Sequence, residues 1–275
     1  MTKRTVLLTA AIVVAAAAGA AAVVLTNEAG EPAAKPCDIP ASAMEKPVPA
    51  SDAIKVAEKG VSSSGLASMG AVLRNTSEKI AYRTRVALKV TVSVNGVAQG
   101  LQGPGMTMEI PVIMPGQQVG IGRPLVAVGE MTKVTSADVE VQTTTWLPRT
   151  ALGSFTPVTD TYESMARATV SPPADVVRYR ETSANCRVLT SRRTAVVFRD
   201  ASGAIVGGDL VPADGKGNPA GAPVEPPASP SCEPGDRSTW IVPMQQIPRE
   251  AEDARTALYS YCDLNSPPTD VNNAY

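Results

Sequence analysis

The spacing of apolar residues is the feature that most restricts how this chain folds. Between residues 83 and 94, apolar side chains recur at every second position, whereas an amphipathic helix repeats them every three or four residues. The apolar positions are Val86, Leu88, Val90, Val92 and Val94. Four of the five alternate positions are polar, and these are Arg85, Lys89, Thr91 and Ser93. This pattern predicts a β-strand with one buried face and one solvated face.

Turn signals follow the strand signals along the whole chain. Asn95-Gly96 comes directly after the alternating stretch, and both residues tolerate the positive φ angles of a tight hairpin. Pro115-Gly116 and Pro234-Gly235 end or begin other apolar runs in the same way. No segment after residue 50 keeps a helical period. The sequence therefore predicts an all-β protein.

The two halves of the chain repeat the same order of landmarks. The offsets between them are 107 to 119 residues, for the pairs Asn75 and Asn185, Gly96 and Gly203, Gly116 and Gly235, Asp138 and Asp253, and Trp146 and Tyr261. A unit of this size with several short strands is typical of an immunoglobulin-like sandwich. We therefore expect two tandem immunoglobulin-like β-sandwiches at residues 50–150 and 160–265, and a disordered tail at 266–275.

The N-terminus has the features of an export segment. Lys3 and Arg4 precede 20 uncharged residues from Val6 to Leu25, and Glu28 follows them. This predicts a single apolar helix in residues 1–25, either a signal peptide or an uncleaved membrane anchor, with the remaining chain outside the membrane. Residues 26–49 are rich in proline, alanine and glutamate and predict a flexible stalk.

Four cysteines in an exported chain predict two disulfides, because the outside compartment is oxidising. The candidates are Cys37, Cys186, Cys232 and Cys262. Cys186 and Cys232 lie beside turns that we expect at the same end of a sandwich, which favours Cys186–Cys232 with Cys37–Cys262; a Cys186–Cys262 bond also fits. The spacings contain no C-x-x-C motif, so we expect no metal site.

The composition excludes several classes of function. The chain has no histidine, which excludes Ser-His-Asp and Cys-His catalysis, histidine-ligated zinc and an imidazole pH switch. The composition does not exclude catalysis by a Ser-Lys dyad or by a pair of carboxylates. The 25 basic and 26 acidic residues are balanced, and two Phe and two Trp offer few stacking platforms, so we expect no nucleic-acid partner. We predict no catalytic residues and no cofactor.

Two stretches resemble a known family of domains. The first runs from Asn75-Thr76-Ser77 through the Asn95-Gly96 turn to the segment 110–116, and the second comprises 196–203, Gly207-Gly208 and Pro234-Gly235. They resemble the FxLYD-type and related immunoglobulin-like domains of bacterial extracytoplasmic surface proteins, although the complete Phe-x-Leu-Tyr-Asp run is absent. The alanine-rich leader is typical of actinobacterial sequences. The resemblance implies a cell-envelope sandwich protein without known catalytic residues.

These features predict a non-catalytic binding or structural protein of the cell envelope, anchored by its N-terminal segment or secreted. Its partner would be a protein or a cell-wall polymer. An accessory or sensor ectodomain of a membrane complex is the alternative, followed by a histidine-free enzyme. We expect Trp146, Trp240, Tyr259 and Tyr261 on strands, in the core or at its rim; an exposed row of them would indicate ligand binding.

Overall fold

The computed structural model describes residues 36–43, 46–49, 52–62, 67–95, 97–101, 106–125, 132–167, 175–212, 231–243 and 247–264. The predicted export segment 1–25 and tail 266–275 lie outside these ranges. Within them, no helix is long and apolar enough to cross a membrane. The described residues form antiparallel strands and one 3₁₀ turn, η1 (Asp253–Arg255), which confirms the all-β prediction.

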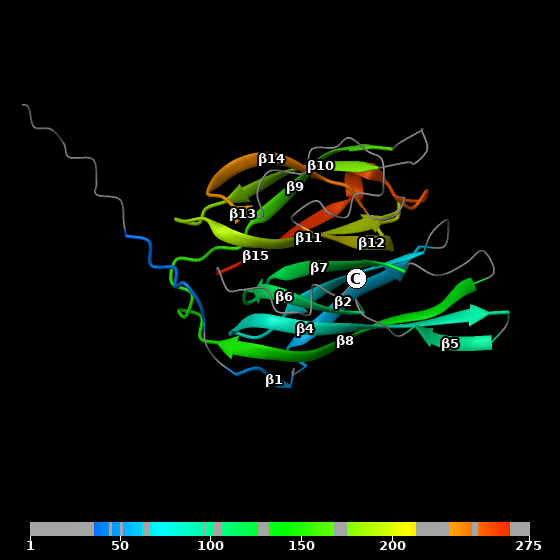
Figure 1. Cartoon of the computed structure of the whole chain (residues 1–275), viewed down its shortest axis with the longest axis horizontal. Helices are drawn as coiled ribbons and strands as arrows, with labels where there is room; N and C mark the ends of the chain where they lie inside the picture. The colour runs from blue at the N-terminus through cyan, green and yellow to red at the C-terminus, as the bar shows by residue number, and fades with distance from the viewer. Residues whose placement is uncertain are drawn as a thin grey trace, which may run out of the picture. The chain divides into compact units, whose positions relative to one another are not determined.

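Two antiparallel sheets make up the first half of the chain (Figure 1). Inner sheet I has the order β2-β3-β7, from β2 (Ile54–Val61), β3 (Ser68–Asn75) and β7 (Gln118–Pro124). Outer sheet I has the order β1-β8-β4-β5, with β6 also paired to β4. Its strands are β1 (Val48–Pro49), β4 (Ile80–Val94), β5 (Val97–Leu101), β6 (Thr107–Ile113) and β8 (Thr132–Leu147).

The second half also forms two antiparallel sheets. Outer sheet II has the order β14-β10-β9, from β9 (Thr159–Ala166), β10 (Val176–Ser183) and β14 (Gly235–Ile241). In inner sheet II, β12 and β13 pair with one edge of β11, and β15 pairs with the other edge. Its strands are β11 (Leu189–Arg199), β12 (Ile205–Pro212), β13 (Ser231–Cys232) and β15 (Ala257–Asp263).

The order of strands is the same in the two halves. The sheet β2-β3-β7 corresponds to β9-β10-β14, and the run β8-β4-β5 corresponds to β15-β11-β12. The strands β6 and β13 pair with the beginnings of β4 and β11, on the same side as β5 and β12. One element breaks the correspondence. In the first half β1 pairs with the outer edge of β8, whereas β15 pairs with β11 alone among the described strands.

Apolar cores fill the space between the sheets of each half. The first core joins inner sheet I to outer sheet I, through side chains such as Leu73 and Val86. The second joins inner sheet II to outer sheet II, through residues such as Phe198 and Tyr179. A third contact joins the two inner sheets through Val72 on β3 and residues on β11 and β12. The inner strands β3 and β11 are therefore buried on both faces.

Glycines allow the two inner sheets to approach closely. Gly60, Gly70 and Gly122 lie in register across inner sheet I. A Cβ atom on any of them would lie within 2.3 Å of a backbone atom of β12. Only glycine fits at such a distance, so β12 packs its backbone directly on this row. The described residues from Cys37 to Leu264 accordingly belong to one compact unit.

The predicted flexible stalk is wrong for its second part. From Cys37 the chain belongs to the compact unit, because Ile39 is buried and β1 pairs with β8. The Asp38 carboxylate accepts a hydrogen bond of 2.7 Å from the Ser154 backbone N–H. Hydrogen bonding with the Ser154 side chain, and with this N–H, lowers the pKa of Asp38. The composition of this segment could not predict these contacts, because only a few of its residues are buried and the rest are polar.

All four cysteines form disulfides, but the favoured pairing was wrong. The bonds are Cys37–Cys186 and Cys232–Cys262. Cys232 on β13 and Cys262 on β15 both lie opposite the first residues of β11, one on each side of that strand, so the sheet itself brings them together. Two disulfides indicate that the chain folds in an oxidising environment, as outside the cytoplasm.

Candidate functional site

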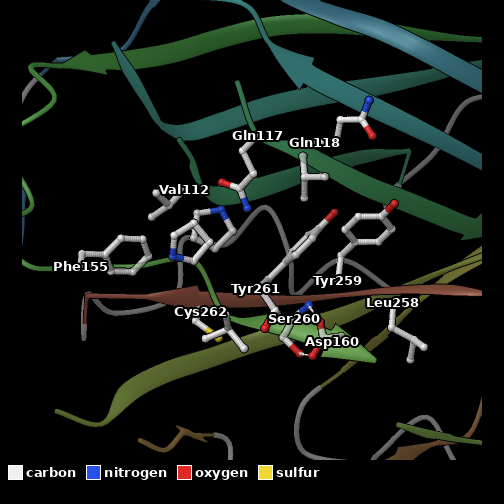
Figure 2. Close-up of a pocket in the computed structure, with 15 residues that line it drawn as sticks. Val112, Gln117, Gln118, Phe155, Asp160, Leu258, Tyr259, Ser260, Tyr261 and Cys262 are labelled. Atoms are coloured by element: carbon white, nitrogen blue, oxygen red, sulfur yellow. Dashed lines mark hydrogen bonds between the residues drawn. The ribbon is translucent and has the colours of Figure 1, made fainter. Parts of the chain in front are cut away.

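The candidate site is a groove beside β15, which we call the β15 groove. It consists of two adjoining hollows of about 440 and 490 Å³ that share Asp160, Leu258 and Tyr259. The first hollow is lined by β6, β7, the segment before β9, and β15 (Figure 2). The second continues along β9 and the segment around η1. Each volume falls in the range of natural ligand sites, and together they make an elongated hollow.

The alternation of β15 sets which side chains line each wall. In Figure 2, Tyr259 and Tyr261 project to one side of the strand, and Ser260 projects to the other, toward Asp160. Tyr261 is buried and donates a hydrogen bond of 2.7 Å to the Gly120 carbonyl of inner sheet I. Burial raises the pKa of Tyr261, so this hydroxyl stays neutral and holds the wall in place.

Tyr259 is an aromatic side chain that the groove leaves partly accessible, as is Tyr162 in the second hollow. Its ring packs over Gly120, where a Cβ atom would lie 2.3 Å from two ring carbons. Glycine at this position is therefore required for the ring to lie flat on inner sheet I. Burial also raises the pKa of Tyr259. The ring presents a half-buried apolar surface with a hydroxyl at its end, as many ligand sites do.

Asp160 on β9 holds the edge of β15. Its carboxylate accepts hydrogen bonds from the Ser260 backbone N–H at 2.5 Å and from the Ser260 hydroxyl at 2.9 Å. Burial raises the pKa of Asp160 to about 7; the bonds from Ser260 act in the opposite direction, and the nearby Glu181 raises the pKa further. Glu181 is itself paired with Arg237 at 2.7 Å. Asp160 thus titrates near neutral pH.

The remaining walls are mostly apolar. Pro111 and Val112 come from β6, and Phe155 and Pro157 come from the segment that connects the two halves. Gln117 stands at the rim, where its side-chain carbonyl accepts a hydrogen bond of 2.7 Å from the Met114 N–H. Apolar walls with a few polar groups suit an uncharged or weakly polar ligand that lies along the strand.

The structure places only part of the residues singled out from the sequence at this groove. Tyr259, Tyr261 and Cys262 line it. Trp146 and Trp240 are half-buried and line neither hollow, so the four aromatic residues do not form one exposed row. Cys37 and Cys186 lie outside the groove and form the disulfide that joins the segment before β1 to the segment before β11.

Sequence reasoning missed Asp160. A charged residue inside a strand is uncommon unless it has a specific partner, and Asp160 stands between two threonines in β9. That signal was present in the sequence. Its partner Ser260 lies 100 residues away, and only the packing of β9 against β15 brings the two together.

One cluster has ligand atoms at metal-binding distances. Atoms of Glu181, Cys232 and Cys262 lie within 4.8 Å of one another. The two sulfurs are bonded to each other in the disulfide, so they offer no thiolate to a metal. The disulfide belongs to inner sheet II and Glu181 to β10 of outer sheet II, so this cluster is a structural contact between the two sheets.

The fold and the groove define a sandwich-like, all-β, disulfide-bonded protein. No family model matches the sequence, and neither a curated protein nor a solved structure matches the chain significantly.

Proposed function

We propose that this chain is a non-catalytic binding protein of the cell envelope, which presents two immunoglobulin-like sandwiches outside the membrane. The shared strand order supports the two sandwiches. Apart from β1, the first two strands of each half enter one sheet, the third enters the opposite sheet, and later strands return to each, as in immunoglobulin-like domains.

Two further observations support this assignment. The repeat landmarks Asn75 and Asn185 are both buried and donate side-chain hydrogen bonds to backbone carbonyls, at 2.9 Å to Ile113 and 2.9 Å to Thr156. The disulfides agree with export, which the apolar N-terminal segment predicts. That segment would tether the protein to the membrane or be removed on secretion.

The β15 groove is the feature that best supports a binding role. It is elongated, walled by apolar and aromatic side chains, and lies beside the edge of β15, with which no described strand except β11 pairs. Both carboxylate oxygens of Asp160 are engaged by Ser260, which gives this residue a positioning role in the fold. The partner would be a protein or a cell-wall polymer.

The proposal is tested with the tagged full chain expressed in its own host. Protease added to intact cells should remove the folded unit, non-reducing gels should show both disulfides, and the purified chain should bind envelope fractions in a saturable way. Recovery of the chain in the cytosol with reduced cysteines would overturn the localisation. Binding that never saturates would overturn the binding role.

A further inference from the structure

The outward face of outer sheet II differs from the corresponding face in the first half of the chain. The two corresponding sheets are β9-β10-β14 and β2-β3-β7. In the first half, this face carries a row of glycines and packs against β12. Outer sheet II lies on the side of inner sheet II that is remote from the first half (Figure 1). Its outward face carries large side chains instead of a glycine row.

The strand registers identify the side chains of this outward face. In β10, the odd-numbered residues from 177 to 183 are buried, whereas Arg178 and Arg180 are exposed and therefore point away from the core. Trp240 on β14 and Ser164 on β9 lie opposite Arg178, one on each side. The three side chains thus form one row across the outward face.

Trp240 is half-buried but does not belong to an apolar core. Its neighbour Ile241 packs in the second core, whereas Trp240 packs in none of the cores formed by the described residues. Opposite residues of an antiparallel pair have Cβ atoms about 5 Å apart. A single ring of a bound molecule can therefore contact both the indole of Trp240 and the guanidinium of Arg178.

A polar network beside this row leaves Arg178 as a cation without an acidic partner. The Arg180 guanidinium donates to one carboxylate oxygen of Glu163 at 3.1 and 3.2 Å, and the Ser238 hydroxyl donates to the same oxygen at 3.0 Å. The network joins β9, β10 and β14 and compensates the charge of Arg180. Among the residues that the structure describes, no acidic side chain pairs with Arg178. The row therefore offers an uncompensated positive charge beside an aromatic ring.

We propose that the outward face of outer sheet II binds an anionic carbohydrate polymer of the cell envelope, with a sugar ring stacked on Trp240 and an acidic group of the polymer paired with Arg178. The acidic group is a carboxylate or a phosphate, since a guanidinium binds both through paired hydrogen bonds. This inference rests on the envelope binding role proposed above and adds a second surface to it, because Arg178 and Trp240 line neither hollow of the β15 groove.

The polarity of the face favours a carbohydrate over a protein partner or a second copy. The core of a protein interface is apolar and contains few charges. Here the side chains around Trp240 are charged or carry a hydroxyl, as at Arg180, Ser164 and Ser238, and all three are exposed. They can exchange hydrogen bonds with sugar hydroxyls, while the indole receives the apolar face of a ring. A second copy cannot pack here as the inner sheets do, because arginine side chains prevent the close approach that glycines allow.

Defined oligosaccharides and single substitutions test the inference. Isothermal titration calorimetry measures the binding of two acidic probes, a galacturonic acid hexamer and pentamannosyl phosphate, to the full chain with its disulfides intact. The fully methyl-esterified hexamer is the uncharged control for the first probe. The variants are Arg178→Gln, Trp240→Ala and Trp240→Tyr. Arg85→Gln is the matched control, because Arg85 is an exposed arginine on β4 of outer sheet I.

We expect saturable binding of at least one acidic probe, and the probe that binds identifies the acidic group of the polymer. Arg178→Gln should weaken this binding about tenfold and remove most of its salt dependence. Trp240→Ala should weaken it about tenfold or more, and Trp240→Tyr only about threefold, because tyrosine keeps an aromatic surface. Arg85→Gln should change it less than about twofold. Arg178 is exposed, so its variant decides the test even if Trp240→Ala does not fold.

Three results would overturn the inference: no saturable binding of either acidic probe, equal affinity for the methyl ester, or equal affinities of the Arg178→Gln and Arg85→Gln variants. A photo-crosslinking residue at position 164 that captures a protein on intact cells, without binding of the acidic probes, would identify a protein partner and also overturn it. These failures differ from failure of the proposed function. The probes are tested on purified protein, whereas the localisation and the binding to envelope fractions are measured separately.

Discussion

Two strands of equal length show how an inner and an outer sheet differ. β3 and β9 each contain eight residues. In β3, on inner sheet I, seven of them are buried, so both faces are covered. In β9, on outer sheet II, half-buried and exposed residues alternate along most of the strand, and no residue is fully buried. The inner strand packs against a sheet on each side, and the outer strand packs on one side only.

The comparison shows which strands can be recognised from an alternation of apolar and polar residues in the sequence. A strand with one solvated face needs polar residues at every second position, and this produces alternation. A strand between two sheets needs apolar or very small residues on both faces. Glycine satisfies this need where backbones come close, as at Gly70 under β12. The following four experiments challenge this contrast, from the largest expected effect to the smallest.

The largest effect is expected from a side chain added between the inner sheets. In Gly70→Val, the new Cβ would lie 2.3 Å from the Gly207 carbonyl oxygen, so β12 or β3 must move. Overpacking of this kind destabilises proteins by about 3 kcal/mol or more when backbone blocks the new group. Urea unfolding monitored by circular dichroism measures it, and Gly70→Ala gives a milder version if the valine variant does not fold.

Gly100→Val is the matched control on an outer strand. Gly100 lies on β5, and a Cβ atom added there meets nothing within 4 Å. We expect a change within about 0.5 kcal/mol, since an exposed strand position tolerates a β-branched residue. Equal stability of the two variants would show that the inner sheets are not packed on the glycine row.

The same contrast explains how much of the structure could be predicted from the sequence. The alternation from Val86 to Val94 correctly gave the long outer strand β4, and Asn95 correctly marked its end. The unbroken apolar run 195–198 was correctly predicted to be a strand. The sequence analysis did not predict that this strand is buried on both faces. Gly207 was interpreted as a family motif, whereas it lies where β12 meets β3.

The site was harder to predict than the strands. The β15 groove depends on which sheet faces which, and no local pattern encodes that arrangement. Tyr259 and Tyr261 were expected to be core or rim residues, and the structure buries one and leaves the other partly accessible. The predicted pairing of the cysteines was wrong for the same reason. It depended on β13 and β15 flanking β11, which is a long-range feature of the fold.

Removal of the Cys232–Cys262 disulfide should give the second largest effect. The bond closes a separation of 30 residues within inner sheet II. Loop-closure entropy predicts that the Cys232→Ala, Cys262→Ala double variant loses about 3 kcal/mol in the free energy of unfolding. Denaturant unfolding measures the loss. A loss below about 1 kcal/mol would mean that the packing of the inner sheets alone restricts the ends of these strands.

The other disulfide provides the comparison for an outer element. Cys37–Cys186 fastens the segment that contains β1. In the Cys37→Ala, Cys186→Ala variant, we expect hydrogen exchange to increase first in residues 36–49, while the amides of β3 and β11 stay protected. Loss of protection in β3 at the same rate would contradict the separation between inner and outer elements.

Asp160 predicts a smaller, pH-dependent effect on an outer strand. Its pKa in the folded protein is about 7, above the ordinary 3.8, so the folded state holds more protons than the unfolded state between these pH values. The free energy of unfolding should therefore fall as the pH rises from about 4 to 7 and stay low above. Asp160→Asn removes the charge and should be more stable than the native chain at pH 8, by about 1–2 kcal/mol.

Asp138→Asn is the control for this titration. Asp138 is an exposed carboxyl group on β8, 2.8 Å from the Lys59 amine, and that contact lowers its pKa. Its removal should leave the fall in stability between pH 4 and 7 in place. Thermal unfolding at several pH values measures both variants. A native chain whose stability rises over this range, or the same slope in Asp160→Asn, would show that Asp160 is better solvated than the packing of β9 against β15 implies.

The smallest effect is expected on the solvated face of outer sheet I. The Lys89 amine lies 3.1 Å from the Glu140 carboxylate across β4 and β8, and their side chains are 63% and 47% exposed. Exposed ion pairs of this kind contribute little, because water and salt screen them and both side chains lose freedom. Lys89→Ala should change the free energy of unfolding by less than about 0.5 kcal/mol, with a difference that vanishes at high salt. A loss above about 1 kcal/mol that persists in salt would mean that this face is covered in solution, and outer sheet I would then resemble an inner sheet.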